Sequence, residues 1–308
     1  MTHATDDHAV AAVDARARTR LRGMVRLARP RQWTKNSLLL AAPTAASVLH
    51  RPAVLASVLG GIALFCLAAS GAYFINDALD VEADRAHPRK RLRPIASGTV
   101  GAREALVGGL VMIVTAIAAA VTIMPAAFTL TIATYAMLTL AYSRWLKHVP
   151  LVEMIVVASG FVLRAMAGGY AAEVPLSEWF LMVATFGALF IVVGKRHAEV
   201  VALGDVRASH RAVLANYTVP LTQHLMTVAA SVTLVGYGLW TFSVQDLGGM
   251  TAPWPALSVL PFVYALSRYA MLTFSGHGGE PEELALGDRG LQVAGLVWAL
   301  LLGIGVYI

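Results

Sequence analysis

The stretch NDALDVEAD at residues 76–84 directly follows the apolar run LGGIALFCLAASGAYFI at 59–75. An expected membrane helix therefore ends in three aspartates, a glutamate and an asparagine. Crowded carboxylates repel one another, and the partial negative charge at a helix C-terminus disfavours them further. A hard divalent cation offsets both penalties, so the stretch predicts a metal site rather than a solvated acidic turn.

Helical spacing predicts which of these side chains lie on the same side of the helix. If the helix continues, 100° per residue places four of them on one arc and points Glu82 away. We therefore expect Asn76, Asp80 and Asp84 to hold Mg²⁺, with Asp77 helping directly or through water. The predicted catalytic residues are Asp77, Asp80 and Asp84.

The composition is that of a membrane protein. Of the 308 residues, 57% are hydrophobic and 14% are charged, whereas a soluble domain is about 25% charged. Apolar blocks near 20 residues long predict membrane spans. We expect an all-α integral membrane protein with nine transmembrane helices, at 35–51, 53–75, 105–123, 125–143, 151–170, 179–194, 218–242, 254–274 and 290–308. Because Cys66 is the single cysteine, an internal disulfide and a Cys-based metal site are excluded.

The positive charge is distributed by topology. With the N-terminus cytoplasmic, nearly all of the 24 Lys and Arg residues fall on that side, and Arg51 alone lies in an opposite loop. The net charge of +6 is thus explained without nucleic acid as a partner. We expect a polar, basic cytoplasmic segment at 1–28 without a signal peptide, followed by a catalytic domain at 29–308 in the cell membrane. The polar site then lies at the cytoplasmic end of the helices.

A basic run follows the carboxylates almost at once, as DRAHPRKRLRPIASG at 84–98. A metal site ringed by Arg and Lys suits a pyrophosphate, because the metal and the cations can share its oxygens. Pro88 and Pro94 prevent the run from continuing as a helix. Mutual neutralisation of acid and base is the plainer alternative.

NDALDVEAD followed by HPRKRLRPIASG resembles the first aspartate-rich motif of the UbiA-type superfamily of intramembrane prenyltransferases, NDxxDxxxD with an HPxKxxRP-like run. The resemblance implies a UbiA-like helix bundle. Most members carry a second motif of the DxxxD type after the sixth span, but this chain has GKRHAEVVALGD at 194–205. Lys195 and Arg196 stand in place of the second acidic cluster.

Three further segments resemble the decaprenyl-phosphate phosphoribosyltransferase branch of that superfamily. They are RPRQWTKN at 29–36, AYSRWLKHVPLVEM at 141–154 and ASGFVLRAMAGG at 158–169. The resemblance implies that 5-phosphoribosyl 1-diphosphate (PRPP) is the donor and a polyprenyl phosphate, such as decaprenyl phosphate, the acceptor, for cell-wall arabinan synthesis. An oligomer is compatible with the sequence.

PRPP carries two phosphate groups, so its binding needs cations besides the metal. The expected ligands of PRPP and the lipid phosphate are Lys35, Tyr142, Arg85, Lys90, Lys147, Arg164, Lys195 and Arg196. The alternative interpretation is that Lys35 only snorkels to the membrane interface and that Lys147 is only a positive-inside charge. The charge of Arg164 inside a span favours function, with Glu153 or Tyr170 as its partner. The small residues of ASGFVLRAMAGG favour helix packing over a phosphate loop.

Two alternatives remain open from sequence. The first is a UbiA-type transferase that moves a prenyl group from its diphosphate to an aromatic or glycerol-type acceptor, for which a second DxxxD motif is missing. The second is a transporter of phosphorylated solutes, which leaves the carboxylate spacing unexplained.

Overall fold

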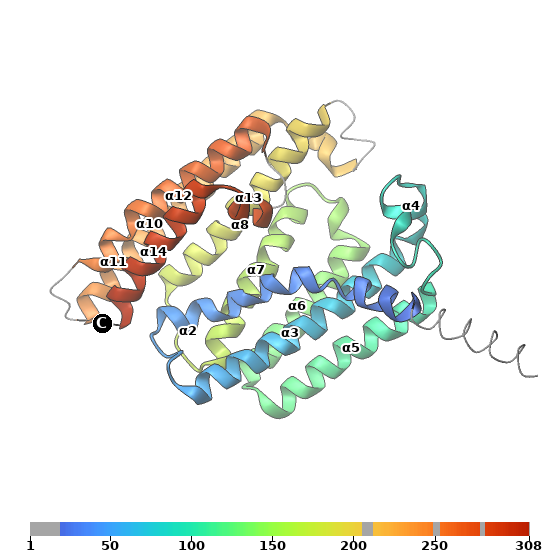
Figure 1. Ribbon diagram of the computed structural model, residues 1–308, viewed down its shortest axis with the longest axis horizontal. Helices are drawn as coiled ribbons and strands as arrows, with labels where there is room; N and C mark the ends of the chain where they lie inside the picture. Colours follow the sequence, from blue (N-terminus) through green and yellow to red (C-terminus); the bar gives the residue numbers. More distant parts are fainter. Residues whose placement is uncertain (1–18, 205–211, 249–252, 278–280, 308) are drawn as a thin grey trace, which may run out of the picture. The chain divides into compact units, whose positions relative to one another are not determined.

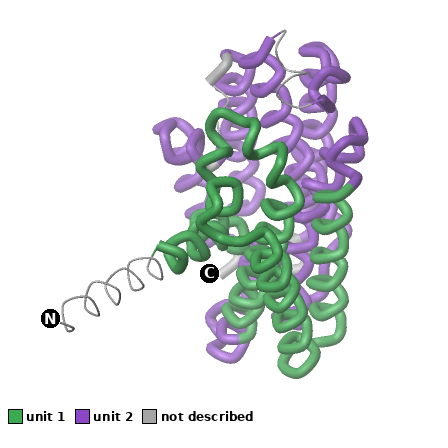
Figure 2. The backbone as a smooth tube through the Cα atoms, turned by 90° about the vertical axis from the view of Figure 1, so that its right-hand side faces the viewer, with its two compact units in different colours: residues 1–37, 57–144 green, residues 38–56, 145–308 purple. Residues whose placement is uncertain are grey.

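The computed structural model describes residues 19–204, 212–248, 253–277 and 281–307, and every regular element within them is a helix (Figure 1). The chain divides into two compact units (Figure 2). Unit 1 takes in residues up to Ser37 together with Ser57–Arg144, and unit 2 takes in Leu38–Ala56 together with Trp145–Ile308.

Unit 1 is built around three long helices. They are α3 (Pro52–Leu79, from Ser57 onward), α5 (Ala102–Ile123) and α6 (Ala126–Arg144), preceded by a helical segment at 19–28 and followed after α3 by α4 (Val81–Ala86) and a 3-10 helix at Lys90–Leu92. Gly71 of α3 and Gly109 of α5 allow the two backbones to approach closely. A Cβ atom built on either glycine would lie within 2.6 Å of the other's carbonyl oxygen, so neither position tolerates a side chain.

The 3-10 helix at Pro30–Leu40 spans the boundary between the units in sequence, and the helices that begin after Leu40, other than those of unit 1, lie in unit 2. They are α2 (Ala41–Ala45), a 3-10 helix at Leu146–His148, α7 (Val152–Ala171), α8 (Glu178–Leu203), a 3-10 helix at Ala212–Asn216, α10 (Val219–Gly248), α11 (Trp254–Leu257), α12 (Val259–Leu272), a π-helical turn at Thr273–His277, α13 (Pro281–Gly287) and α14 (Arg289–Tyr307). Helix α8 packs along α7 and α10, and α12 packs along α14. The core between α7, α8 and α10 includes Met154, Phe190 and Met226.

Seven of the nine predicted spans are confirmed as long apolar helices in the described part of the chain. They are Pro52–Leu79, Ala102–Ile123, Ala126–Arg144, Val152–Ala171, Glu178–Leu203, Val219–Ser243 and Trp254–Ser275. The predicted span at 290–308 is a shorter apolar helix at Arg289–Gly305. The protein is therefore a multi-pass membrane protein with an all-helical bundle.

The predicted first span at 35–51 is wrong as a single α-helix. Residues 35–40 belong to a 3-10 helix at Pro30–Leu40, residues 41–45 form the short helix α2, and residues 46–51 lie in turns and bends. Pro43 has no N–H to extend a hydrogen-bonded ladder, and Ser47 turns the chain with a φ of 56°. The composition predicts an apolar helix here, but the backbone does not form one continuous α-helix.

The small residues of ASGFVLRAMAGG serve packing, as the sequence predicts. A Cβ atom on Gly168 of α7 would collide with the backbone carbonyl of Leu39, and one on Gly169 would collide with the side chain of Leu176. Unit 2 therefore holds the segment around Leu39 against α7 by backbone contact, which only glycine permits.

This contact predicts that Gly168→Ala lowers stability by about 1–3 kcal/mol, because the methyl group must displace backbone. Gly238→Ala is the matched control, since no atom lies within 4 Å of its Cβ position and alanine is the better helix former. Melting temperatures of the purified proteins in detergent provide the measurement. Equal melting temperatures for the two variants would contradict the packing assignment.

Candidate active site

The acidic stretch spans a junction between two helices. Helix α3 ends at Leu79, and Asp80, with φ −93° and ψ 6°, precedes α4. The amides of Asp80 and Asp84 nevertheless donate to carbonyls four residues earlier, at 3.0 and 2.8 Å. Helical spacing thus continues through the junction although the helix itself is interrupted.

Two of the carboxylates are buried. Asp77 and Asp84 are each 3% exposed, and the same guanidinium nitrogen of Arg93, Nη1, lies 3.1 Å from Asp77 Oδ1 and 2.8 Å from Asp84 Oδ2. Glu82 is exposed and pairs with Arg85 at 3.3 Å. The stretch therefore has a buried side with Asp77 and Asp84 and a solvent side with Glu82.

A second arginine reaches the same carboxylate from an earlier segment. Arg29 Nη2 donates to Asp77 Oδ1 at 2.6 Å, and its guanidinium lies over the ring of Tyr73, 4.6 Å from the centroid. Ser70 of α3 fixes this segment, because its hydroxyl accepts from Trp33 Nε1 and donates to the carbonyl of Ala28. Arg29 joins the helical segment at 19–28 to the following 3-10 helix with a φ of 50°.

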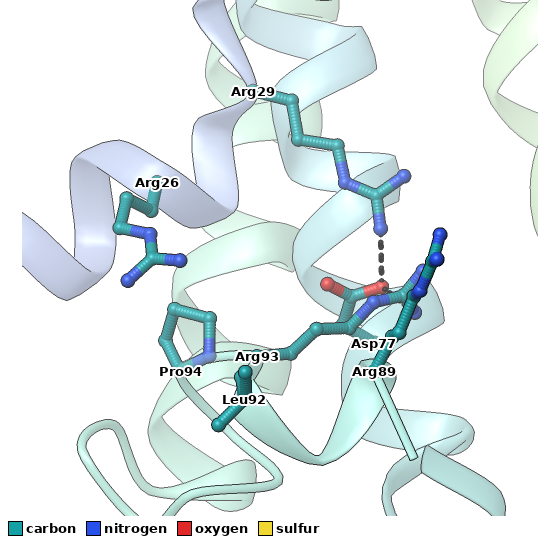
Figure 3. Close-up of a pocket in the computed structure, with 7 residues that line it drawn as sticks. All are labelled: Arg26, Arg29, Asp77, Arg89, Leu92, Arg93 and Pro94. Atoms are coloured by element: carbon teal, nitrogen blue, oxygen red, sulfur yellow. Dashed lines mark hydrogen bonds and ion pairs between the residues drawn. The ribbon is translucent and has the colours of Figure 1, made fainter. Parts of the chain in front are cut away.

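These arginines border a cavity of about 380 Å³ in unit 1 (Figure 3). Its lining residues are Arg26, Arg29, Asp77, Arg89, Leu92, Arg93 and Pro94. Four guanidinium groups against one lining carboxylate leave an excess of positive charge. Planar guanidinium groups with paired N–H donors suit phosphate oxygens, so the cavity can bind a phosphorylated ligand.

None of these four arginines was among the predicted ligands. The signal was nonetheless in the sequence, because Arg89 and Arg93 lie in the basic run at 84–98 and Arg29 opens RPRQWTKN. A count of charges cannot tell which cation of such a run faces the carboxylates. That choice depends on how the loop folds back onto α3.

The acidic side chains are of the kind that Mg²⁺ prefers. Asp77, Asp80 and Asp84 supply hard carboxylate oxygens, and Asn76, whose amide nitrogen donates to Asp80 Oδ2 at 3.3 Å, supplies an amide oxygen. Among the described residues, no three Asp, Glu, His or Cys side chains converge on one point as they stand. The donor set fits a divalent cation in its chemistry, and the structure additionally places the Arg93 cation on two of the donors.

The other predicted ligands of unit 1 lie outside the set that lines the cavity. Arg85 is exposed and donates to the carbonyl of Ala96 as well as to Glu82. Lys90 is half-buried in its 3-10 helix, Lys35 is half-buried in Pro30–Leu40, and Tyr142 is half-buried in α6.

In unit 2, Arg196 is buried within an ion-pair cluster. Its Nε and Nη2 donate to the two carboxylate oxygens of Glu153 at 2.6 and 2.9 Å, and its Nη1 donates to Glu199 at 2.6 Å. Glu153, expected as a candidate partner of Arg164, thus forms its bidentate pair with Arg196. Lys195, the neighbour of Arg196 in α8, is half-buried.

Arg164 is buried within α7, in keeping with an intramembrane charge that points into protein. Its Nη1 donates to the carbonyl of Gly160 at 2.7 Å, and its guanidinium lies 5.9 Å from the ring centroid of Phe161. Lys147 is half-buried in the 3-10 helix at Leu146–His148.

Comparison with known proteins identifies the family. Residues 37–286 match the model of the UbiA prenyltransferase family. The chain belongs to that family. This confirms the resemblance that NDALDVEAD and its basic run indicate.

Two curated relatives are similar over most of their length. The chain is 43% identical over 296 residues to decaprenyl-phosphate phosphoribosyltransferase of Mycolicibacterium smegmatis, with 92% of each chain covered. It is 40% identical over 290 residues to the protein of the same name from Corynebacterium glutamicum, with 93% of this chain and 87% of that one covered. Both names are those of the branch that the sequence predicts.

A solved structure shows the same fold. A UbiA homolog from Archaeoglobus fulgidus, bound to GPP and Mg²⁺, superposes with a TM-score of 0.70. It covers 92% of this chain and 99% of its own, at 17% sequence identity. The all-helical UbiA fold is therefore shared.

The bridge formed by Arg93 predicts a stability effect that is independent of catalysis. Arg93→Gln removes a charged partner from two buried carboxylates, so unfolding should become easier by about 1–3 kcal/mol. Arg85→Gln removes the exposed pair with Glu82 and a long hydrogen bond to the carbonyl of Ala96, so it should cost at most about 1 kcal/mol. Thermal unfolding in detergent separates the two, and a larger loss for Arg85→Gln would contradict the assignment.

Proposed function

We propose that this protein transfers the 5-phosphoribosyl group of PRPP to a polyprenyl phosphate such as decaprenyl phosphate, releasing pyrophosphate. The observation that carries the proposal is the 40–43% identity to two enzymes of that name over about nine-tenths of the chain. The arginine-lined cavity beside Asp77 supports it, because the donor is an anion with two phosphate groups.

The cellular setting belongs to the same proposal. The bias of Lys and Arg toward one set of loops supports a cytoplasmic N-terminus and a cytoplasmic site in the cell membrane. The lipid-linked phosphoribose then serves as a precursor of cell-wall arabinan.

The reaction is a substitution at C1 of the ribose. The bond from C1 to the pyrophosphate oxygen breaks while a lipid-phosphate oxygen forms a bond to C1 from the opposite face, inverting that centre. A phosphate monoester has its second pKa near 6, so the nucleophile is largely ionised at neutral pH. Catalysis therefore relies on positioning and electrostatic stabilisation, without a strong general base.

The acidic stretch would hold the divalent cation. Asn76, Asp80 and Asp84 are its proposed ligands, with Asp77 assisting. When bound, Mg²⁺ neutralises charge on the departing pyrophosphate. Arg93, which bridges two of these carboxylates, also lines the cavity, so it is a proposed ligand of a phosphate oxygen of the donor.

The proposed phosphate ligands include cationic side chains from both units. In unit 1, Arg26, Arg29 and Arg89 line the cavity with Arg93 and are added to the proposed phosphate ligands. The earlier candidates Lys35, Tyr142, Arg85, Lys90, Lys147, Arg164 and Lys195 remain proposed ligands of PRPP or the lipid phosphate. Arg196 differs from these ligands, because three of its nitrogens already donate to carboxylate oxygens.

A second candidate is transfer of a prenyl group from a prenyl diphosphate to an aromatic or glycerol-type acceptor. Prenyl transfer is the reaction in the description of the matching family, and the Archaeoglobus fulgidus homolog is bound to GPP and Mg²⁺. At 17% identity that structure supports a common fold only. The Lys195–Arg196 pair in place of a second acidic motif also disfavours this candidate.

The purified protein tests the choice directly. We expect label from radiolabelled PRPP to move into the lipid phase when Mg²⁺ and a polyprenyl phosphate are present, and to stay aqueous with EDTA. Labelled prenyl diphosphate with an aromatic or glycerol-type acceptor is the parallel reaction. Transfer only in the parallel reaction would overturn the proposed donor.

Two isosteric substitutions test the assignment of the acidic side chains. Asp80→Asn should lower kcat by about 10²–10³-fold, the usual loss when a group that stabilises transition-state charge is removed. Glu82→Gln should leave kcat near the wild-type value, because Glu82 is exposed and pairs with the exposed Arg85. Steady-state kinetics at several Mg²⁺ concentrations measure both, and equal damage by the two substitutions would show the assignment to be wrong.

A further inference from the structure

A strained turn lies immediately before helix α7. Leu151 has φ 63° and ψ −45°, and the amide of Val152 donates to the carbonyl of Pro150 at 2.8 Å. These are the features of a three-residue γ-turn of the rare form, which a residue with a Cβ atom adopts only when its surroundings enforce it. Leu151 is 46% exposed, so packing of its own side chain is a weak explanation for the turn.

The turn determines the direction in which the preceding segment enters α7. The 3-10 helix at Leu146–His148 ends three residues before Leu151, and it carries Lys147. This 3-10 helix contacts α7 and the 3-10 helix at Ala212–Asn216, all within unit 2. A change of the Leu151 backbone would therefore redirect the segment that carries Lys147.

A buried tyrosine holds the turn. The amide of Leu151 donates to the Tyr217 hydroxyl oxygen at 2.9 Å, and that hydroxyl donates to Glu153 Oε1 at 3.3 Å. Tyr217 is 1% exposed and Glu153 is fully buried. Burial raises the pKa of the Tyr217 phenol, so the hydroxyl keeps its proton at neutral pH and can donate while it accepts.

Arg196 anchors the other end of this chain of contacts. Its bidentate pair with Glu153 neutralises a carboxylate that is otherwise without access to water, and it fixes the carboxylate plane. The first turn of α7 also favours the negative charge of Glu153. The connected groups are thus the Arg196 guanidinium, the Glu153 carboxylate, the Tyr217 hydroxyl and the Leu151 amide.

We propose that Tyr217 is a positioning residue, which with the Glu153–Arg196 pair holds the strained turn at Leu151 so that Lys147 is set to bind a substrate phosphate. Arg196 then acts through Glu153 and Tyr217 rather than on phosphate itself. The proposal rests on the proposed function for Lys147 as a ligand, and it assigns roles to Tyr217, Glu153 and Leu151 that no motif indicates.

Removal of the Tyr217 hydroxyl group tests whether this residue holds the turn at Leu151. Tyr217→Phe should raise the KM for PRPP or for the polyprenyl phosphate about tenfold while kcat changes less than threefold. Tyr237→Phe is the matched control, since it removes another buried tyrosine hydroxyl of unit 2, bonded to Ser258 and Trp298. It should lower the melting temperature and leave KM unchanged; a KM for Tyr217→Phe equal to wild type would overturn the proposal.

Glycine at the strained position gives a rescue experiment. Leu151→Gly relieves the strain at positive φ, so Tyr217→Phe with Leu151→Gly should recover KM to within about threefold of wild type. Leu151→Ala keeps the Cβ atom and should give no rescue. Leu151→Gly alone should melt at or above the temperature of Leu151→Ala; a lower melting temperature would refute the strain even if Tyr217→Phe failed to fold.

A double-mutant cycle with Lys147 tests whether Tyr217 affects substrate binding through Lys147. In a Lys147→Met background, Tyr217→Phe should raise KM by less than twofold further, because the group that it positions is gone. Additive effects would overturn the link to Lys147. No transfer by the wild-type protein would instead refute the proposed function, and an unchanged KM for Lys147→Met would refute Lys147 as a ligand, so the failures are distinguishable.

Discussion

The burial of Asp77 near the end of α3 and of Asp84 in α4 is the constraint on which unit 1 depends. A carboxylate removed from water is costly unless a cation and hydrogen-bond donors replace the solvent. Arg29 and Arg93 meet this requirement from two segments that flank α3 in sequence, and in doing so they bring both segments onto its end. The same arrangement that makes the acidic stretch tolerable produces a cavity lined by arginine.

Unit 2 also buries a carboxylate, but there the arginine that pairs with it is buried as well. Glu153 is fully buried, and Arg196 completes a bidentate pair with it across α7 and α8. In unit 1 the arginines border a cavity, whereas in unit 2 Arg196 is itself buried, with 4% of the residue exposed. An exposed cationic rim suits ligand binding, and a buried pair suits the orientation of neighbouring groups, which is why Arg29 and Arg196 receive different roles.

Much of the fold follows from local patterns. Seven long apolar blocks became seven long helices because a helix satisfies its own backbone hydrogen bonds within the segment, so hydropathy over about 20 residues is sufficient to predict it. The block at 35–51 failed because hydropathy ignores backbone geometry around Pro43 and Ser47. The orientation of Glu82 away from the buried carboxylates was likewise predictable from 100° spacing, since helical spacing continues through Asp80.

By itself, the sequence determined that the chain crosses the membrane several times, that it belongs to the UbiA family, and that acid and base concentrate at the end of α3. Each of these is carried by composition, or by motifs contained in a few neighbouring residues. Only the tertiary structure decided which charges meet: Arg29 pairs with Asp77 across 48 positions, and Arg196 with Glu153 across 43. Such pairs form because packing places distant segments side by side, and no spacing along the chain encodes that distance.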